Sequence, residues 1–159
     1  MKPATVAHIK KELKFRSSEE LEALCLRLAR FKKENKELLT YLLFEADHEE
    51  AYVTQVKEHI AEGFSEINTS SFYYVKKSIR KILRETKKYI RYSSAKETEV
   101  ELLLYFCETL QDFKPSIKHS VTMVNLYNRQ IALIEKKILA LHEDLQYDYR
   151  IELEKLWQI

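Results

Sequence analysis

The chain has 159 residues, of which 45% are hydrophobic and 33% charged, and its formal net charge at pH 7 is +2. It contains one glycine and two prolines, where average composition would give about eleven and eight. Tight turns and sheet connections rely on residues that tolerate positive φ, so this composition excludes a sheet-rich fold and predicts an all-α one. The length suits a single all-helical domain over residues 1–159 that buries its own core.

Three helices are predicted at the start of the chain. Pro3 suits the first turn of a helix over residues 4–14, whose apolar side chains are spaced by three and four: Val6, Ile9 and Leu13. Ser17 and Glu20 have the spacing of a capping box and begin a second helix. The apolar face of this second helix consists of Leu21, Leu24, Cys25, Leu28 and Phe31.

The polar run over residues 32–36 is the expected turn before the third helix, which extends from residue 37 to about residue 46. This helix is apolar nearly all round, so we expect it to be sandwiched between other helices. A fourth helix begins at a cap, Asp47, and ends near Ile67. Its inward side chains are Val53, Val56, Ile60, Phe64 and Ile67.

Residues 68–71 form the clearest loop of the chain and precede a fifth helix over 72–92. A sixth helix follows a cap at Ser93–Ser94 and ends at Asp112; it contains the unbroken apolar run 102–107. Pro115 separates it from a seventh helix that begins at Ser116.

The C-terminal segment contains no helix-breaking residue, and its apolar positions continue in steps of three or four to Leu156. Either one helix of about 40 residues spans roughly 60 Å, or the chain bends near His142–Tyr147. A compact domain favours the bend. The last apolar side chains, Leu153, Leu156 and Trp157, then either close the core or face a partner or a second copy of the chain.

These elements predict seven or eight antiparallel helices in one of two arrangements. Segments 21–32 and 103–114 match at several positions when aligned with an offset of 82 residues. A genuine repeat would give HEAT-like stacked helical hairpins, that is, an α-solenoid. Any two amphipathic helices match partly through their periodicity, so an irregular helical bundle is the alternative.

Charge is distributed unevenly along the chain. Residues 72–96 hold nine basic side chains and one acid, Glu85, which gives this stretch a charge of +8 and leaves −6 for the rest. At 100° per residue, six of these cations fall within about 60° of one line on the fifth helix. They are Lys77, Arg80, Lys81, Arg84, Lys88 and Arg91, and they are bordered by Tyr73, Tyr74 and Tyr92.

A basic stripe with aromatic rings beside it predicts a partner-binding surface. The cations suit a phosphate backbone and the rings suit stacking on exposed bases, although an acidic protein also fits the cations. The competing interpretation is that the stripe pairs with the preceding acidic helix. In that helix Glu58, Glu62 and Glu66 form an i,i+4 ladder.

No stretch carries a catalytic signature. Glu45 and His48 have the Glu-x-x-His spacing of di-iron helical bundles, but no second such pair exists. The single glycine, Gly63, lies inside a predicted helix, so it cannot build a nucleotide-binding loop. We therefore expect no cofactor, no metal site and no small-molecule substrate.

We expect a cytoplasmic protein without a membrane span. No apolar run approaches the ~18 residues that a membrane-spanning helix needs, and residues 1–3 lead into an amphipathic stretch rather than the apolar centre of a secretory signal. Two cysteines, Cys25 and Cys107, lie inside apolar helical patterns. That setting is typical of buried, reduced thiols.

The sequence therefore favours a non-catalytic cytoplasmic protein-interaction or scaffold domain, which binds a protein partner or associates with itself. Nucleic-acid binding through the basic helix 72–92 is the alternative hypothesis. A metal-dependent helical-bundle enzyme is the third.

Overall fold

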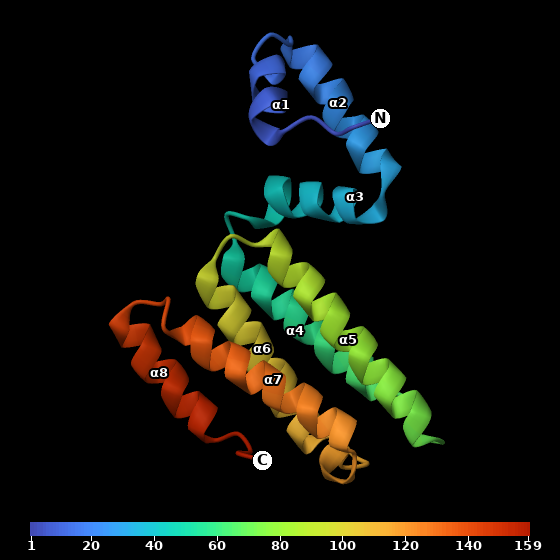
Figure 1. The fold of residues 1–159 in the computed structure, drawn as a ribbon, viewed down its shortest axis with the longest axis vertical. Coiled ribbons are helices and arrows are strands. Elements are labelled where there is room, and N and C mark those ends of the chain that lie inside the picture. Colours follow the sequence, from blue (N-terminus) through green and yellow to red (C-terminus); the bar gives the residue numbers. More distant parts are fainter. The chain divides into compact units, whose positions relative to one another are not determined.

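The computed structural model describes all 159 residues and is helical throughout, with 77% of residues in helices and no strand. This confirms the prediction of an all-α fold. Its eight α-helices fall into two compact units, residues 1–44 and 45–159 (Figure 1). HEAT-like stacking and a single domain over 1–159 stay predictions.

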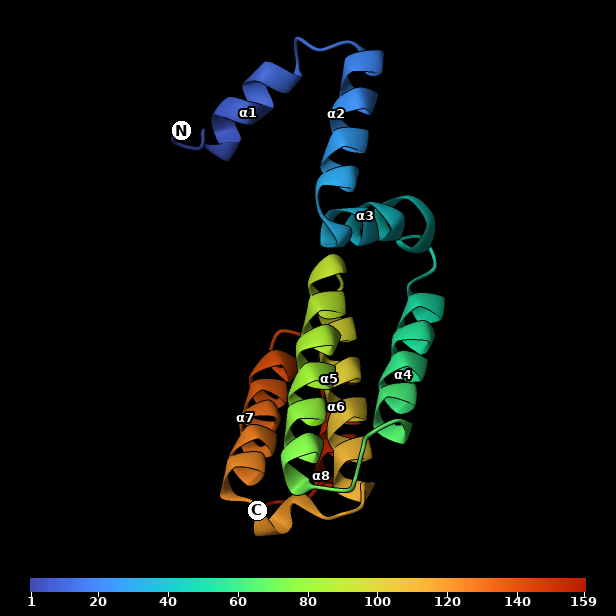
Figure 2. The same ribbon diagram turned by 90° about the vertical axis from the view of Figure 1, so that its right-hand side faces the viewer.

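The first unit contains α1 (Val6–Leu13), α2 (Ser18–Phe31) and α3 (Lys33–Thr40). The predicted capping box begins α2: the Glu20 backbone N–H donates to Ser17 Oγ at 3.1 Å, and the Ser17 N–H donates to Glu20 Oε2 at 3.2 Å. Helices α2 and α3 pack against each other, whereas α1 diverges from α2 and packs along neither helix (Figure 2).

The corner between α2 and α3 consists of Lys32 alone, in an extended conformation. The predicted turn over 32–36 is wrong beyond this residue, because the lysines and glutamate that follow are good helix formers and α3 begins at Lys33. Asn35 Nδ2 donates to the Leu28 carbonyl at 2.8 Å, which holds α3 against the end of α2. A π-helical turn, Tyr41–Glu45, follows α3.

The second unit contains α4 (Glu49–Ser65), α5 (Phe72–Tyr92), α6 (Lys96–Asp112), α7 (Val121–Ile138) and α8 (Glu143–Glu154). The fourth helix starts one residue later than expected, because His48 rather than Asp47 is its N-cap. The seventh starts at Val121 rather than Ser116, because a 3-10 turn, Ile117–His119, comes first.

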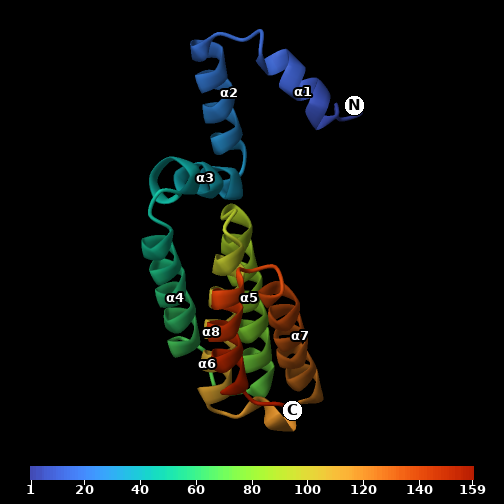
Figure 3. The ribbon, with the colours of Figure 1, turned by 90° about the vertical axis from the view of Figure 1, so that its left-hand side faces the viewer.

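Helix α6 lies at the centre of this unit and contacts α4, α5, α7 and α8 (Figure 3). Its predicted apolar run is buried except for Tyr105, which is half-buried, and the Phe106 ring centroid lies 5.7 Å from that of Phe64 on α4. The side chains of α6 without exposed surface are Val100, Leu102, Leu103, Phe106, Cys107 and Leu110. A helix that is apolar on several sides requires such surroundings.

Polar contacts fix the helices around α6 in register. Three glutamates of α6, spaced two residues apart, each bind a different helix. Glu97 accepts from Tyr149 Oη at 2.7 Å, Glu99 pairs with Lys137 at 3.0 Å, and Glu101 pairs with Lys57 at 2.6 Å. Since these groups are partly exposed, each of the two ion pairs contributes at most about 1 kcal/mol. They position the neighbours more than they stabilise them.

The C-terminal segment bends as predicted, but at residues 139–142 rather than near His142–Tyr147, because residues 143–154 form the continuous helix α8. His142 caps α8 by accepting the Asp144 backbone N–H at its ring, at 3.3 Å. Leu153 and Leu156 are buried, and the Trp157 ring centroid lies 6.1 Å from that of Tyr127 on α7. The apolar end of the chain therefore closes its own core, which removes the basis for a dimer through this segment.

Replacement of Phe106 by alanine should lower the free energy of unfolding of the 45–159 unit by about 3–5 kcal/mol, because loss of a fully buried ring leaves a cavity. The control is Leu139→Ala, at a side chain that is 66% exposed, and it should cost less than about 0.5 kcal/mol. Denaturant titrations followed by circular dichroism measure both. Equal effects of the two variants would contradict the central position of α6.

Stability should fall at alkaline pH. Burial raises the pKa of the Tyr127 hydroxyl from 10.0 to about 12 and that of the Cys107 thiol from 9.0 to about 12. The unfolded chain releases these protons at lower pH than the folded chain does. The contribution of the two groups to the free energy of unfolding is therefore complete below about pH 9 and is lost as the pH rises toward 12. Tyr127→Phe should make the fall shallower between about pH 10 and 12. Titrations of wild type and of Tyr147→Phe, an exposed control, provide the comparison.

Candidate functional site

Helix α5 has one buried and one charged side along its 21 residues, a length of about 30 Å. Ser71 caps it by accepting the Tyr73 backbone N–H at 3.2 Å. The buried side chains are Val75, Ile79, Ile82, Leu83 and Thr86. Gly63 of α4 lies opposite, where an added Cβ would stand 3.1 Å from Ile82, so α4 and α5 approach closely.

The six predicted cations, which we call the basic face, lie on the outer side of α5. Five of them are exposed and Lys88 is half-buried, with its Nζ 4.8 Å from the centroid of the Tyr89 ring. The exposed members are Lys77, Arg80, Lys81, Arg84 and Arg91. The helix thus brings together the predicted basic residues on one accessible surface.

The three predicted tyrosines differ in their surroundings. Tyr73 is 64% exposed and Tyr74 is 46% exposed, and their rings meet edge to face at 5.6 Å at the start of the helix. Tyr92, at the opposite end, is half-buried and contacts the Tyr89 ring at 6.0 Å. Tyr73 and Tyr74 therefore present rings to solvent, whereas Tyr92 belongs largely to the packing of the helix end.

The five exposed cations of the basic face do not form the ion pairs with the acidic helix α4 that the competing interpretation expected. Lys77, Arg80, Arg84 and Arg91 form no ion pair, and neither does the glutamate ladder of α4. Among the five exposed cations of the basic face, only Lys81 pairs with a carboxylate, that of Glu85 on the same helix, at 3.9 Å. Glu85 in turn binds His59 of α4 at 3.0 Å.

Like charges at i,i+4 destabilise a helix by roughly a few tenths of a kcal/mol per pair. The basic face contains three such pairs: Lys77 with Lys81, Arg80 with Arg84, and Arg84 with Lys88. Burial of the opposite side of α5 offsets this repulsion. A bound anion would relieve it, so the surface is electrostatically suited to a polyanion.

A second surface, not identified from the sequence, covers residues 1–44. No residue of α1, α2 or α3 is buried. Apart from Met1, this unit exposes twelve large apolar side chains, whereas the remaining 115 residues expose seven. The twelve are Val6, Ile9, Leu13, Phe15, Leu24, Leu26, Leu28, Phe31, Leu38, Leu42, Leu43 and Phe44.

Two predictions fail on this surface. The expected sandwiching of the helix over 37–46 is wrong, because Leu42, Leu43 and Phe44 are 56%, 63% and 70% exposed. The expected burial of Cys25 is also wrong: its side chain is exposed, while Cys107 is buried as predicted. Periodicity identified the apolar faces correctly, but a unit of 44 residues has too few helices to cover them.

Part of this surface is a groove between α2 and α3, with a volume of about 190 Å³. Apolar side chains from both helices and from the π-helical turn form its walls, and Asn35, which ties the two helices together, is its one polar residue. The walls consist of Cys25, Leu28, Ala29, Leu38, Leu39 and Leu42. Ligand sites for small molecules usually measure about 300–1,000 Å³, so this groove suits protein side chains.

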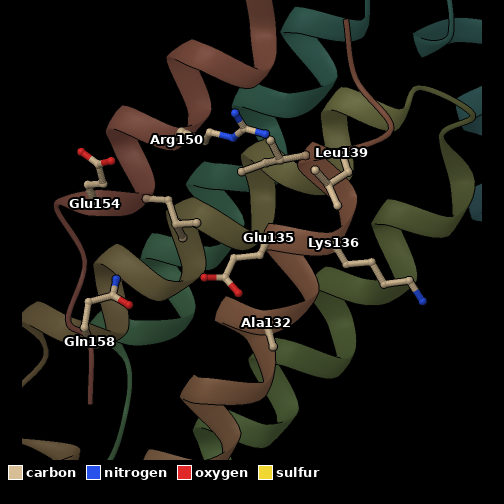
Figure 4. A pocket seen from close by; sticks show the side chains of 9 residues that line it. Ala132, Glu135, Lys136, Leu139, Arg150, Glu154 and Gln158 are labelled. Atoms are coloured by element: carbon tan, nitrogen blue, oxygen red, sulfur yellow. The ribbon is translucent and has the colours of Figure 1, made fainter. Parts of the chain in front are cut away.

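A larger cleft lies between α7 and α8 and has a volume of about 670 Å³ (Figure 4). Its charged lining residues are Glu135, Lys136, Arg150 and Glu154, all exposed to solvent. In Figure 4 these side chains extend in different directions rather than toward one point. Sites that bind small ligands combine an enclosed apolar pocket with convergent polar groups, and this cleft lacks that convergence.

A hollow of about 750 Å³ beside the ends of α4 and α6 contains Glu108. Burial and the neighbouring Glu152 raise the pKa of this carboxyl. General acid–base catalysis requires a proton acceptor or donor placed against a reacting group. Glu108 shares this hollow with the hydroxyls of Ser65 and Thr109, which donate to the backbone carbonyls of Glu62 and Tyr105.

The half-motif Glu45 and His48 gains no further ligands in the fold. No group of three histidine, cysteine or acidic side chains is arranged to hold a metal ion. Glu45 Oε2 instead accepts a hydrogen bond from Gln55 Nε2 at 3.2 Å. This contact gives the residue a structural partner within the 45–159 unit.

Comparisons with known proteins add no functional assignment. No protein-family model, curated protein or solved structure matches the chain. None of the helices has the length and apolar character needed to cross a bilayer. The basic face and the apolar surface of residues 1–44 are therefore the two candidate sites.

Proposed function

We propose that the protein is a non-catalytic interaction or scaffold protein whose N-terminal unit docks on another protein surface. The observation that carries this proposal is the complete absence of buried residues in α1, α2 and α3. Amphipathic helices gain most of their stability from burying their apolar faces. An outside surface that covers these faces would complete the unit.

The amount of exposed apolar area supports an interface. Three phenylalanines and nine aliphatic side chains amount to on the order of 1,000 Å² of apolar area in contact with water. A standard interface buries about 800 Å² on each partner, so residues 1–44 carry enough surface for one.

The shape of the surface favours a protein over a lipid bilayer. A helix that lies on a bilayer needs one continuous apolar face against a flat boundary. Here the walls of a concave groove belong to two helices, with Leu28 on α2 and Leu38 on α3. Side chains of a protein segment fill such a groove, in the manner of helix-in-groove recognition.

Aspartates at Leu28 and Phe31 should abolish the association of the full-length chain with its partner, because each would place a charge in a desolvated contact. Tagged wild type, the double variant Leu28→Asp/Phe31→Asp and a control, Val121→Asp/Tyr147→Asp, are expressed in the native host and isolated. The control side chains are 75% and 68% exposed and lie outside residues 1–44.

The same protein should be recovered with wild type and control and lost with the double variant. Circular dichroism of each variant verifies that the helices persist. Equal recovery with all three chains would contradict the proposal that residues 1–44 form the docking surface.

A second candidate function is nucleic-acid binding by the basic face of α5. It rests on the observation that Lys77, Arg80, Arg84 and Arg91 are exposed and form no ion pair. Cations recur along the outer side at each turn of about 5.4 Å, which suits the repeated charges of a phosphate backbone. The exposed rings of Tyr73 and Tyr74 are available to stack on unpaired bases.

The triple variant Arg80→Gln/Arg84→Gln/Arg91→Gln should lose nucleic-acid binding and reduce the slope of log K against log salt by up to about 3. The control removes three exposed cations elsewhere: Arg129→Gln/Lys136→Gln/Arg150→Gln. Fluorescence anisotropy with labelled single- and double-stranded RNA and DNA, from low to moderate salt, measures the affinities. No binding of any probe by wild type at low salt would end this hypothesis, and retention on polyglutamate alone would indicate an acidic protein instead.

A further inference from the structure

We propose that the partner of the N-terminal unit is a second copy of this chain, with α1 of each protomer seated in the α2–α3 groove of the other. This inference rests on the proposed function and identifies the molecule that binds the docking surface of residues 1–44. It would form a symmetric dimer in which the two protomers exchange their first helices.

The groove is ready to receive a helix. Asn35 Nδ2 donates to the Leu28 carbonyl at 2.8 Å and α2 packs against α3, so both walls of the groove come from one chain. Its walls are apolar apart from Asn35, and its volume of about 190 Å³ suits a few side chains of one helical face. Preformed, apolar grooves bind amphipathic helices through anchors at i, i+3 and i+7.

The chain itself supplies a helix with that pattern. Val6, Ile9 and Leu13 of α1 have the spacing i, i+3, i+7 and lie within about 60° of one line. Their side chains are 83%, 46% and 39% exposed, although α1 is capped by Thr5, whose Oγ1 accepts the His8 N–H at 3.3 Å. Helix α1 is thus formed and apolar on one face, and it packs along neither α2 nor α3.

A second copy covers more of this surface than the chain's own α1 does. The connection from α1 to α2 has four residues, 14–17, and an α1 folded back within its own chain would cover only one side of α2. Leu24 and Phe31 continue the apolar stripe of α2 away from the groove and are 42% and 83% exposed. A two-fold arrangement buries two grooves, two α1 helices and both outer stripes, which brings the contact toward the size of a stable dimer interface.

Cysteine cross-linking tests this arrangement, because Cys25 is exposed and lines the groove. Three single variants place a cysteine on the apolar face of α1: Val6→Cys, Ile9→Cys and Leu13→Cys. Ala7→Cys, on the opposite side of α1, is the matched control. A disulfide requires Cα atoms within about 7 Å, so oxidation reports whether α1 reaches the groove and in which chain.

At least one face variant should form a doubly linked dimer on a non-reducing gel. The Ala7→Cys control should remain monomeric, and so should each face variant after Cys25→Ala. The buried Cys107 stays in place in all chains. A fast-migrating monomer, with the disulfide formed inside one chain, would overturn the proposal in favour of an internal closure by α1.

Sedimentation of the unmodified full-length chain provides the second measurement. Wild type should associate reversibly to twice its mass of 19.0 kDa, and Ile9→Asp should weaken this association by at least about tenfold. Labelling of Cys25 by a thiol reagent should slow by about tenfold when wild type is concentrated and should remain fast in Ile9→Asp. Because the contact is apolar, added salt should not weaken it.

A chain that stays monomeric at every concentration and forms no interchain disulfide would overturn the second-copy proposal. The proposal that residues 1–44 dock on another protein is tested separately. It would stand if a different protein were recovered with wild type and lost with Leu28→Asp/Phe31→Asp. A dimer that forms without any α1–Cys25 disulfide and tolerates Ile9→Asp would also overturn the exchange of α1.

Discussion

The burial of α6 by four other helices is the interaction on which residues 45–159 depend. Leu103, Phe106 and Leu110 have no exposed surface, and each large apolar side chain buried in this way contributes about 1.5–3 kcal/mol relative to exposure. Because α6 supplies core contacts in several directions, each surrounding helix needs only one apolar face. The outer face of α5 is therefore free to accumulate cations, whose mutual repulsion the buried opposite face offsets.

Residues 1–44 lack an equivalent of α6. Two of their three helices have eight residues each, and isolated helices of that length are not stable in water without tertiary contacts. Segments of about 40 residues also bury too little area to fold alone without additional support. The unit has apolar faces but no further helix to cover them. As a result, α1 stays apart from α2 and α3, and the groove between α2 and α3 stays open. In the proposed dimer, a second protomer supplies a helix for the groove and a groove for α1.

Features that depend on local sequence could be predicted closely. The capping box at Ser17, the bounds of α5 and the burial of Phe106 follow from cap chemistry, from flanking loop residues and from an apolar pattern that no turn interrupts. Features that depend on what surrounds a helix could not. The pattern of α2 is as amphipathic as that of a core helix, yet Cys25 and Phe31 are exposed, since periodicity states which face is apolar and not what covers it. For the same reason, the separation of the basic face from the glutamate ladder required coordinates.

The two candidate surfaces depend on different forces, which allows their contributions to be separated. Attraction between the basic face and a phosphate backbone is screened by salt, with a Debye length of about 8 Å at physiological ionic strength. The proposed apolar contacts between copies of residues 1–44 would not be screened by salt, and sulfate would strengthen them. If both surfaces function, each dimer carries two basic faces, and a long polyanion that engages both gains affinity through effective concentration. Weakening the α1 contact would then lower the apparent affinity for long nucleic acids more than for short ones, although no residue of α1 touches them.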